Sequence, residues 1–598
     1  MDIKFEEHKD LTSLTTFGIP ARARWYTEYS SEAELLKISR SEIFINNEIL
    51  NLGGGSNLLF IDEFDGLVLH SRIEGIKRYD KNPDNVYVIA GAGVNWDEFV
   101  DWCVARQLGG VENMAGIPGC VGASAVQNVG AYGVEAKDVI YSVECFDTLT
   151  RKPCRFTNAE CRFGYRDSFF KHEGKDRYIV LRVCFRMIPG NEATNLEYGP
   201  LREFKEKLGH TPTLRETAEE IRRIRNGKLP DWHEIGSAGS FFKNPVISRP
   251  HWEDICARSG MEIPAHDVGE HLKKLSAAWL IDHAGMKGHR VGGAHVWEKQ
   301  PLVLANVDHA TATDVAVLAN EVRSAVRRRF YIDLLPEVNY IDTSIKVTVL
   351  GSGTSKGVPE VGCECEVCRS TDPRDKRRRA SVLVQTHGMN LLIDASADFR
   401  QQALDAHIYN LDAVLITHVH YDHIGGIEDL RPFCATGDLP LYVRKDVDTD
   451  LRERLAYCFK EHPYPGVPKF DMRVIDNYPF HINGLKITPI EVLHGSKPIF
   501  GYRIGNFAYV TDCKHISEIE KEKLEGLDVL MVNALRDRDH FAHFTVQEAL
   551  DLIAEVKPGT AYLTHLNHEV ETHDFFDRRL PENVHPAYDG LVIEINGK

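Results

Sequence analysis

The sequence predicts two large units, an α+β unit followed by a sandwich of β-sheets, and three observations support this interpretation. A chain of 598 residues is long enough for roughly four domains of about 150 residues. Up to about residue 190, short apolar runs alternate with glycine-rich turns, which indicates an α+β fold rather than a regular βαβ alternation. Beyond residue 345, apolar runs repeatedly end in His or Asp, which favours a sheet sandwich with a site along one edge.

The composition is that of an ordinary folded protein. Hydrophobic residues make up 43% of the chain and charged residues 27%. The formal net charge of −17 disfavours binding to nucleic acid or to anionic membranes, because such binding requires an excess of Lys and Arg. We find no apolar run as long as a membrane helix and no signal-peptide core, so we expect a cytoplasmic protein. The oligomeric state stays open, with a dimer through the C-terminal unit as one alternative.

The first domain, expected over residues 1–200, contains two loops that are poor in side chains. Such loops let backbone N–H groups approach a pyrophosphate closely, although a glycine turn between strands is usually only a turn. Neither loop follows the G-x-G-x-x-G pattern, which argues against a Rossmann nicotinamide domain. The candidate cofactor-binding residues are Gly53, Gly54, Gly55, Ser56, Asn57, Ile117, Pro118, Gly119, Gly122 and Ala123.

The second domain, expected over residues 201–343, begins with a helical pattern in which Ile221 and Ile224 lie at helical spacing. Strand-like runs then return around residues 239–243 and 301–305. A new unit of strand and glycine turn opens at residue 345, and we place the third domain at 344–598. The joint contains no Gly/Ser or Pro tract, so we expect the two units to be held close together.

A cluster of three histidines and one aspartate follows the apolar run 413–417 in the third domain. Such residues have little reason to gather in a core, because each buried polar group needs a partner, and a pair of metal ions supplies one. Three further candidates stand at the ends of later strand-like runs. The candidate ligands are His418, His420, Asp422, His423, His494, Asp512 and His565.

Seven ligands of this kind are enough for two ions. We expect His418, His420 and His494 to hold one ion, Asp422, His423 and His565 the other, and Asp512 to bridge them. Two cations about 3.5 to 4 Å apart hold a hydroxide between them and stabilise both oxygens of a phosphoryl displacement. Imidazole and carboxylate ligands suit Zn²⁺ or Mn²⁺, and the sequence does not choose between these metals.

A second metal motif is the run Cys363-x-Cys365-x-x-Cys368. The other ten of the 13 cysteines are scattered singly, as is typical of reduced thiols rather than of a disulfide framework. Thiolates at this spacing bind zinc strongly without any catalytic role, and three cysteines with one histidine make a complete tetrahedral zinc shell.

Residues 345–595 resemble the metallo-β-lactamase superfamily of hydrolases, which implies an αββα sandwich. The stretch 351–359 and the cysteine motif resemble more narrowly the PhnP phosphodiesterases, which act on ribosyl 1,2-cyclic phosphate. This resemblance implies that His568 completes a structural zinc site with the three cysteines. It also implies that His543 assists the substrate phosphate or the leaving group.

Two alternatives remain for this unit. A tRNA-processing endonuclease of the same superfamily requires a basic arm rich in Gly and Pro, and we find none in the sequence. The other alternative, a zinc-stabilised docking module whose hydrolytic site is spent, is disfavoured because all seven ligand types are retained.

The first two domains resemble UDP-N-acetylenolpyruvoylglucosamine reductases of the MurB family, type I, through four ordered motifs at 127–133, 161–171, 239–245 and 335–338. The resemblance implies an FAD-binding domain of the vanillyl-alcohol-oxidase or PCMH type, followed by the C-terminal α+β substrate domain of this family. It implies that NADPH reduces the flavin, and that hydride then passes to the enolpyruvyl double bond of a UDP-sugar. The alternative is another flavin oxidoreductase with the same FAD fold, such as an oxygen-using oxidase.

The same resemblance assigns residue roles. Arg166 and Glu337 match the groups that stabilise negative charge on the substrate, a task that requires preorganised donors. Ser240 matches the proton donor that quenches the carbanion, an unusual task for a hydroxyl group. The positions that match substrate contacts are Tyr132, Tyr165, Tyr198, Arg225, Lys228 and Asn244.

Overall fold

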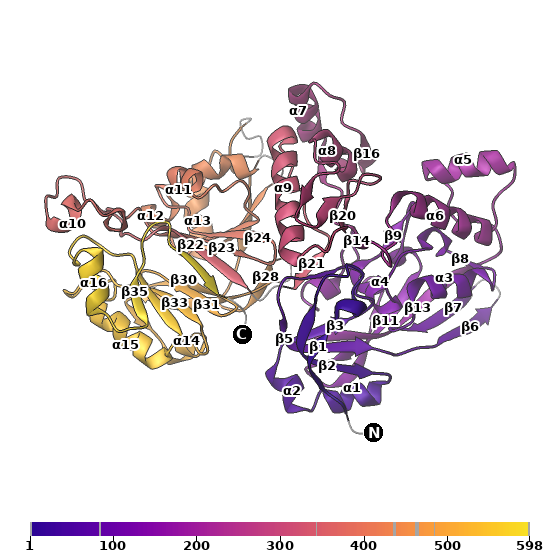
Figure 1. The fold of residues 1–598 in the computed structure, drawn as a ribbon, viewed down its shortest axis with the longest axis horizontal. Coiled ribbons are helices and arrows are strands. Elements are labelled where there is room, and N and C mark those ends of the chain that lie inside the picture. Colours follow the sequence, from indigo (N-terminus) through magenta and orange to yellow (C-terminus); the bar gives the residue numbers. More distant parts are fainter. Residues whose placement is uncertain are drawn as a thin grey trace.

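The computed structural model describes residues 3–82, 85–341, 344–434, 438–460, 466–482 and 485–595. The N-terminal unit (indigo to magenta) and the C-terminal unit (orange to yellow) lie side by side, and helix α9 (Ala312–Phe330) stands at their boundary (Figure 1). Within the described ranges, no helix is both long and apolar enough to cross a membrane.

The first domain contains two sheets. The smaller sheet has the order β1-β2-β5-β3, formed by β1 (Glu6–Asp10), β2 (Arg22–Tyr29), β5 (Phe64–Ser71) and β3 (Ile49–Leu52), with α1 (Glu32–Ile38) and α2 (Glu42–Asn46) beside it. The larger has the order β12-β11-β13-β7-β6, formed by β12 (Lys152–Thr157), β11 (Ile140–Asp147), β13 (Tyr178–Pro189), β7 (Asn85–Gly91) and β6 (Ile76–Asn82), with β8 (Leu108–Gly109) paired to β13. Helices α3 (Trp96–Val104) and α4 (Val121–Gln127) share its core.

Two helices continue the first domain beyond its expected boundary at residue 200. They are α5 (Gly199–Leu208) and α6 (Leu214–Lys228), and the latter begins at a capping box formed by Thr213 and Glu216. Their apolar faces bury Leu201 and Ile221 in the core of the larger sheet. These helices therefore pack with the first domain rather than with the second.

The second domain forms its own core around α9. Its four-stranded sheet has the order β14-β20-β19-β18, formed by β14 (Gly236–Ser240), β20 (Val303–Asn306), β19 (Ala294–Val296) and β18 (Arg290–Val291). Its three-stranded sheet has the order β15-β17-β16, formed by β15 (Val246–Ser248), β17 (Leu272–Leu275) and β16 (Ala265–Val268), with α7 (Arg249–Ser259) and α8 (Ala277–His283) nearby.

The chain then returns to the first domain. Strand β21 (Asn339–Ile341) pairs in parallel with β4 (Leu58–Phe60), so that Asn339 lies opposite Leu58. This pairing brings Glu337 next to the first glycine loop, where the side-chain amide of Asn57 donates to the Glu337 carbonyl at 2.9 Å.

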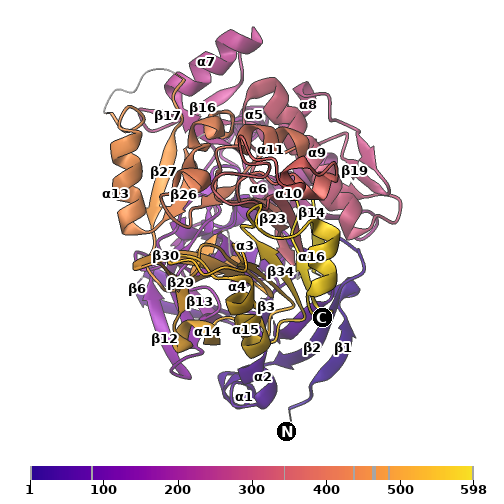
Figure 2. The ribbon, with the colours of Figure 1, turned by 90° about the vertical axis from the view of Figure 1, so that its left-hand side faces the viewer.

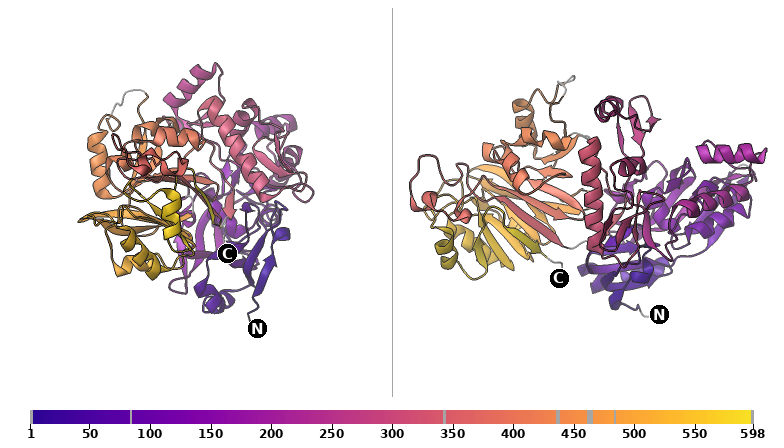
Figure 3. Two further views of the ribbon diagram at one scale, coloured as in Figure 1. Left: turned by 60° about the vertical axis from the view of Figure 1, so that its left-hand side comes forward. Right: turned by 45° about the horizontal axis from the view of Figure 1, so that its top comes forward.

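The C-terminal unit is a sandwich of two sheets with helices on the outside (Figures 2 and 3). The seven-stranded sheet has the order β27-β26-β25-β24-β23-β22-β36, and the eight-stranded one follows β28-β29-β30-β31-β33-β34-β35, with β32 off this path. Both contribute to the central apolar core, which includes Leu391 and Tyr502. The first sheet comprises β22 (Ile345–Gly351), β23 (Ser381–Thr386), β24 (Met389–Ile393), β25 (Ala413–Leu415), β26 (Leu439–Val443), β27 (Phe470–Val474) and β36 (Val592–Ile595).

The strands of the second sheet are β28 (Phe480–Ile482), β29 (Leu485–His494), β30 (Lys497–Ile504), β31 (Phe507–Val510), β32 (His515–Ile516), β33 (Val529–Asn533), β34 (Thr560–Thr564) and β35 (Val584–Pro586). The outer helices are α10 (Glu366–Arg369), α11 (Phe399–Asp405), α12 (Tyr421–Ile424), α13 (Lys445–Arg454), α14 (Glu518–Glu522), α15 (Val546–Val556) and α16 (His573–Arg579). The expected αββα sandwich is confirmed.

The two units are joined by buried polar contacts. Arg323, on α9, forms a 2.8 Å ion pair with Asp412 of the C-terminal unit, and both side chains are almost completely buried. Arg327, one turn further along α9, donates to the carbonyl of Pro432 at 2.7 Å. The units are therefore held together, as the short joint between them indicated.

Candidate metal centres and flavin cavity

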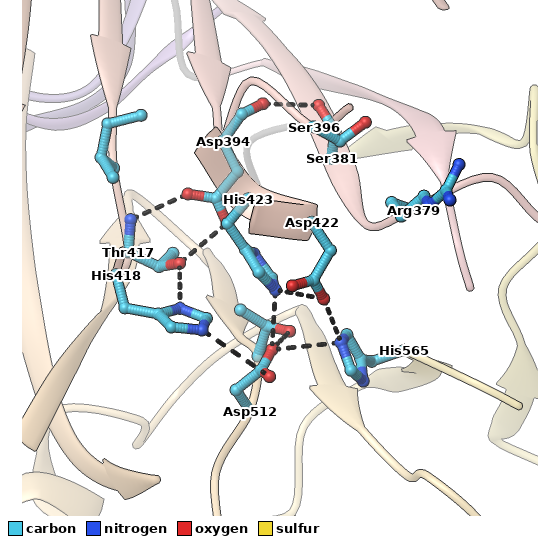
Figure 4. A network of polar contacts seen from close by, with 12 residues as sticks. Arg379, Ser381, Asp394, Ser396, Thr417, His418, Asp422, His423, Asp512 and His565 are labelled. Atoms are coloured by element: carbon cyan, nitrogen blue, oxygen red, sulfur yellow. Dashed lines mark hydrogen bonds and ion pairs between the residues drawn. The ribbon is translucent and has the colours of Figure 1, made fainter. Parts of the chain in front are cut away.

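The seven candidate ligands of the C-terminal unit converge on one place, and Figure 4 shows five of them, His418, Asp422, His423, Asp512 and His565. Their ligand atoms form two groups, in each of which all atoms lie within 4.8 Å of one another. Asp512 belongs to both groups. One group comprises His418, His420, His494 and Asp512, and the other Asp422, His423, Asp512 and His565. This is the partition expected for two ions that share one carboxylate.

Strand ends deliver these side chains. Strands β31 and β34 flank β33 in a parallel arrangement, so their carboxyl ends meet at one edge of the sheet. Asp512 and His565 follow these ends with φ angles of +54° and +57°. Left-handed backbone in a residue other than glycine costs about 1–3 kcal/mol and gathers at functional sites. The segment from the end of β25 through α12 supplies four further candidate ligands, which are His418, His420, Asp422 and His423.

The site is buried and carries surplus negative charge. Nε2 of His423 lies 3.2 Å from carboxylate oxygens of both Asp422 and Asp512. Burial alone would lower the pKa of His423, but Asp422, Asp512 and Asp394 outweigh it and raise that pKa. Nε2 of His418 is buried without a hydrogen-bond partner, and burial lowers the pKa of this ring, which keeps it neutral. Neutral imidazoles facing clustered carboxylates fit divalent cations.

Asp394 is a functional residue that the sequence reasoning missed. It is completely buried, and its Oδ2 accepts a 2.6 Å hydrogen bond from Nδ1 of His423 (Figure 4). The backbone N–H and the hydroxyl of Thr417 also donate to it, each at 2.8 Å. These contacts turn Nε2 of His423 toward the site, as is usual for metal-binding histidines. The sequence could have identified this residue, because Asp394 directly follows the apolar strand β24.

His543 lies against the cluster. Its Nδ1 is 3.5 Å from Oδ1 of Asp512, and its ring centroid is 4.6 Å from that of His494. Burial lowers the pKa of His543 to about 3, so the ring is neutral at pH 7. A neutral imidazole beside the candidate ligands can form a hydrogen bond to a bound phosphate group. His540 lies next to His543, at 4.9 Å between ring centroids.

The predicted Cys3His set also comes together. The ligand atoms of Cys363, Cys365, Cys368 and His568 all lie within 4.8 Å of one another, and Sγ of Cys363 is 3.3 Å from Nδ1 of His568. Burial raises the pKa of Cys365, but hydrogen bonds, including those from the Cys368 backbone N–H and from His568, lower it to about 6. A thiolate is therefore available at neutral pH, and the donor set fits a structural zinc ion.

In the N-terminal unit, all ten candidate cofactor-binding residues line one cavity of about 660 Å³. The two glycine loops pack backbone against backbone. A Cβ atom on Gly54 would lie 2.6 Å from Cα of Gly119, and one on Gly53 would lie 2.8 Å from Sγ of Cys120. Only glycine fits at these contacts, so backbone rather than side chains forms this part of the wall. Such a cradle fits a pyrophosphate group.

The three candidate catalytic residues of this unit line the same cavity. Nε of Arg166 lies 2.9 Å from Oε1 of Glu337, and both side chains are largely shielded from solvent. Ser240 is the last residue of β14. Residues far apart in the sequence thus face one space next to the glycine loops.

The candidate substrate residues are arranged in two groups. The rings of Tyr132 and Tyr198 meet edge to face with centroids 5.3 Å apart, and Tyr198 is partly exposed. Arg225 lines the cavity and donates to the Gly116 carbonyl at 3.1 Å, and desolvation lowers its pKa. Its guanidinium would be stabilised by an anionic ligand.

Tyr165, of the first domain, and Asn244, of the second, are two further substrate candidates, and Tyr165 lies against a lysine that was not singled out from the sequence. Nζ of Lys274 lies 3.4 Å from the ring centroid of Tyr165. The side chain of Asn244 accepts a hydrogen bond from the Ala277 backbone N–H at 2.9 Å. Lys228 is exposed at the end of α6. No sequence pattern identifies Lys274, because only the fold places it against Tyr165.

Lys171 and Lys243 also line the cavity and were not singled out from the sequence. Burial lowers the pKa of Lys171 to about 8, although Nζ donates to the side chain of Gln127 at 3.2 Å. Both lysines lie within the family motifs at 161–171 and 239–245, and this location could have identified them as candidate site residues.

The folds and sites define a class of protein, a flavoprotein unit joined to a hydrolase unit of the β-lactamase superfamily. Residues 27–149 match the FAD binding domain, residues 231–341 the C-terminal domain of UDP-N-acetylenolpyruvoylglucosamine reductase, and residues 389–566 the β-lactamase superfamily domain. Through its N-terminal part, the chain belongs to the family of UDP-N-acetylenolpyruvoylglucosamine reductases.

Relatives named UDP-N-acetylenolpyruvoylglucosamine reductase support this assignment. The protein from Neisseria gonorrhoeae is 43% identical over 340 residues, which cover 56% of this chain and 98% of that protein. The protein from Porphyromonas gingivalis is 40% identical over 341 residues, which cover 57% of this chain and 100% of that protein.

Two solved structures are similar to separate parts of the chain. A diphosphatase from the PhnP family is 38% identical, with 42% of this chain and 97% of that chain covered and a TM-score of 0.40. The reductase MurB from Thermus caldophilus is 25% identical, with 57% of this chain and 99% of that chain covered and a TM-score of 0.40.

Proposed function

We propose that the N-terminal unit reduces UDP-N-acetylenolpyruvoylglucosamine to UDP-N-acetylmuramate with FAD and NADPH, a step of peptidoglycan precursor synthesis. The observation that carries this proposal is that Arg166, Glu337 and Ser240 line the same cavity as the two glycine loops. The cradle of glycine backbone fits FAD, which when bound supplies the hydride.

The residues of the chain provide the rest of the chemistry. Negative charge develops toward the substrate carboxylate during reduction, and the guanidinium of Arg166, oriented by its 2.9 Å contact with Glu337, stabilises this charge through preorganised hydrogen bonds. Ser240 donates a proton to the carbon that becomes a carbanion. The buried cation Lys171 adds positive charge to the cavity wall below its pKa of about 8. Tyr132, Tyr165, Tyr198, Arg225, Lys228 and Asn244 bind the UDP-sugar.

An anaerobic experiment tests this function. The purified protein should show a flavin absorption spectrum that NADPH bleaches, and the spectrum should return only when the enolpyruvyl UDP-sugar is added. An oxygen-using oxidase would instead reoxidise rapidly in air and ignore the UDP-sugar. A protein that binds no flavin would contradict the proposal.

For the C-terminal unit, we propose a dinuclear metal phosphodiesterase that acts on a cyclic ribose phosphate. The sharing of Asp512 by two ligand groups supports two catalytic ions, Zn²⁺ or Mn²⁺, beside one structural zinc. Such a pair supplies a hydroxide nucleophile when bound. His420 is the exposed member of the seven candidate ligands, so we expect solvent and substrate to approach from its side. His543, whose ring is neutral at pH 7, assists the substrate phosphate or the leaving oxygen through a hydrogen bond.

Metal analysis and substrate comparison test this second activity. We expect about three metal ions per chain, whereas a docking module with a spent site would hold one. Ribosyl 1,2-cyclic phosphate, a diphosphate ester and a tRNA precursor should be compared at equal metal loading. Hydrolysis of the cyclic phosphate in preference to the other two is the expected result. Preference for the tRNA precursor would identify a nuclease instead.

A further inference from the structure

A turn of the C-terminal unit reaches the flavin cavity of the N-terminal unit. His387 and Gly388 connect β23 to β24 in a two-residue hairpin, with φ angles of +52° and +67°. Such positive angles at both central residues are those of a tight hairpin turn. His387, Gly388 and Met389 line the cavity together with the glycine loops. The second unit therefore contributes to the wall of a site that the first unit defines.

The turn lies away from the reacting end of the cavity. Strand β21 starts two residues after Glu337, where the first glycine loop ends, and runs away from that loop, paired with β4. Tyr340, three residues after Glu337, lies against the turn, since a Cβ atom on Gly388 would be 2.9 Å from its ring. At about 3.3 Å per residue of extended chain, the turn lies roughly 10 Å beyond Glu337.

This order along the cavity matches the order of groups in FAD. The isoalloxazine ring belongs beside Arg166 and Ser240, and the pyrophosphate belongs at the glycine loops. We propose that the turn His387–Met389 forms part of the wall around the adenosine end of the bound FAD, a proposal that rests on the function proposed for the N-terminal unit. The imidazole of His387 offers a flat surface suited to a purine ring, whereas the side chain of Met389 packs into the core of the C-terminal unit, so that this residue adds only backbone to the wall.

The turn is held rigidly in this position. Arg323, from α9 of the N-terminal unit, donates to the Gly388 carbonyl at 3.2 Å and to Oδ1 of Asp412 at 2.8 Å. The other oxygen of Asp412 accepts from the Asn390 backbone N–H at 2.8 Å. A buried arginine thus ties the start of β24 to the N-terminal unit. Because the wall is preorganised, little ordering entropy is lost when a ligand binds against it.

The proposal makes the hydrolase unit a determinant of cofactor retention. Removing a contact to the adenosine should weaken FAD without affecting FMN, because FMN contains the same flavin and one phosphate but no adenosine. Because the coupling between two binding events is reciprocal, bound FAD should also slow the opening of the hairpin turn at His387 and Gly388.

The test uses the full chain after removal of its flavin. Dissociation constants for FAD and for FMN are measured by fluorescence in the wild type and in His387→Ala. We expect His387→Ala to bind FAD about tenfold more weakly, equivalent to one lost contact of ordinary strength, and to bind FMN as the wild type does. His585→Ala, at β35 on the far sheet edge of the same unit, is the matched control and should leave both constants unchanged.

Hydrogen exchange in the wild type provides a second readout that needs no substitution. The backbone amides of residues 386–389 should exchange at least threefold more slowly with FAD bound than with FMN bound. Equal FAD affinity in all variants, or equal exchange with both flavins, would overturn the proposal and leave the reductase function standing. Failure of the wild type to bind either flavin would instead remove the reductase function on which the proposal rests.

Discussion

Nδ1 of His423 donates a 2.6 Å hydrogen bond to the Asp394 carboxylate, and both side chains are completely buried. The contact fixes the tautomer of His423 and turns its other nitrogen toward Asp422 and Asp512. A residue outside the two ligand groups therefore orients a candidate metal ligand.

Replacing this carboxylate by an amide tests its role. We expect Asp394→Asn to weaken binding of the catalytic metals about 10- to 100-fold, because the amide keeps the shape but loses the charge that holds the His423 proton. Metal titration of the apoprotein measures the effect. Asp405→Asn removes an exposed aspartate of the same unit and should have no such effect. Equal metal affinity in the two variants would contradict the role.

Removing the shared carboxylate should change the metal stoichiometry. Because Asp512 belongs to both ligand groups, we expect Asp512→Ala to lose both catalytic ions and to keep the structural zinc, so that the count falls from about three to about one. Elemental analysis of the purified variant checks this. A variant that retained one catalytic ion would show that Asp512 does not bridge.

The cysteine site should behave independently. In Cys365→Ser the structural zinc is lost, the two catalytic ions remain, and the thermal midpoint of the C-terminal unit falls, because binding of a structural metal contributes directly to folding. Calorimetry and elemental analysis are the measurements. Cys458→Ser replaces a cysteine outside the cluster and is the control. Loss of all three ions in Cys365→Ser would show that the two sites are not separable.

The ion pair between the units should matter strongly to stability. Arg323→Met leaves Asp412 buried without its charged partner, which costs about 3–5 kcal/mol, measured by denaturant unfolding. The exposed pair of Arg258 with Asp254 gives the comparison, since Arg258→Ala should cost less than about 0.5 kcal/mol. Pairing Arg323→Met with Asp412→Leu should recover most of the loss. No recovery would point to misfolding rather than to an unpaired charge.

Ser240→Ala should separate the two halves of the reductase reaction. Reduction of the flavin by NADPH should keep its wild-type rate, whereas reoxidation by the enolpyruvyl substrate should slow about 10²- to 10⁴-fold, the usual contribution of a general acid. Stopped-flow absorbance follows both steps in one sample, so the first step is the internal control. Equal slowing of both steps would assign Ser240 a structural role.

The sequence predicted the fold class and singled out residues that the structure brings close together. Metal-type residues at strand ends were visible because strands and turns leave local patterns, and the structure gathers His494, Asp512 and His565 as those patterns indicated. The glycine loops were visible for the same reason. Gly54 lies so close to Gly119 that only glycine fits there, and this requirement is visible in the sequence as glycine-rich loops.

Residues that act through distant partners were not predictable. Lys274 meets Tyr165, and Arg323 meets Asp412, only after separate domains have packed together. A lone lysine or arginine on an amphipathic element is usually solvated, so its sequence position carries no information about a buried partner. The packing of α5 and α6 with the first domain was also not predictable, because the apolar face of a helix does not indicate which core it packs against.

The parallel pairing of Leu58 in β4 with Asn339 in β21 has a consequence for synthesis of the protein on the ribosome. Strand β4 has no partner strand until residue 341 has left the ribosome. At about 5–20 residues per second, this interval lasts tens of seconds. During that time its hydrogen-bonding edge is unprotected, which is a hazard for aggregation. Pairing over such a separation is also slow to form, so completion of the nascent first domain is coupled to translation of the second.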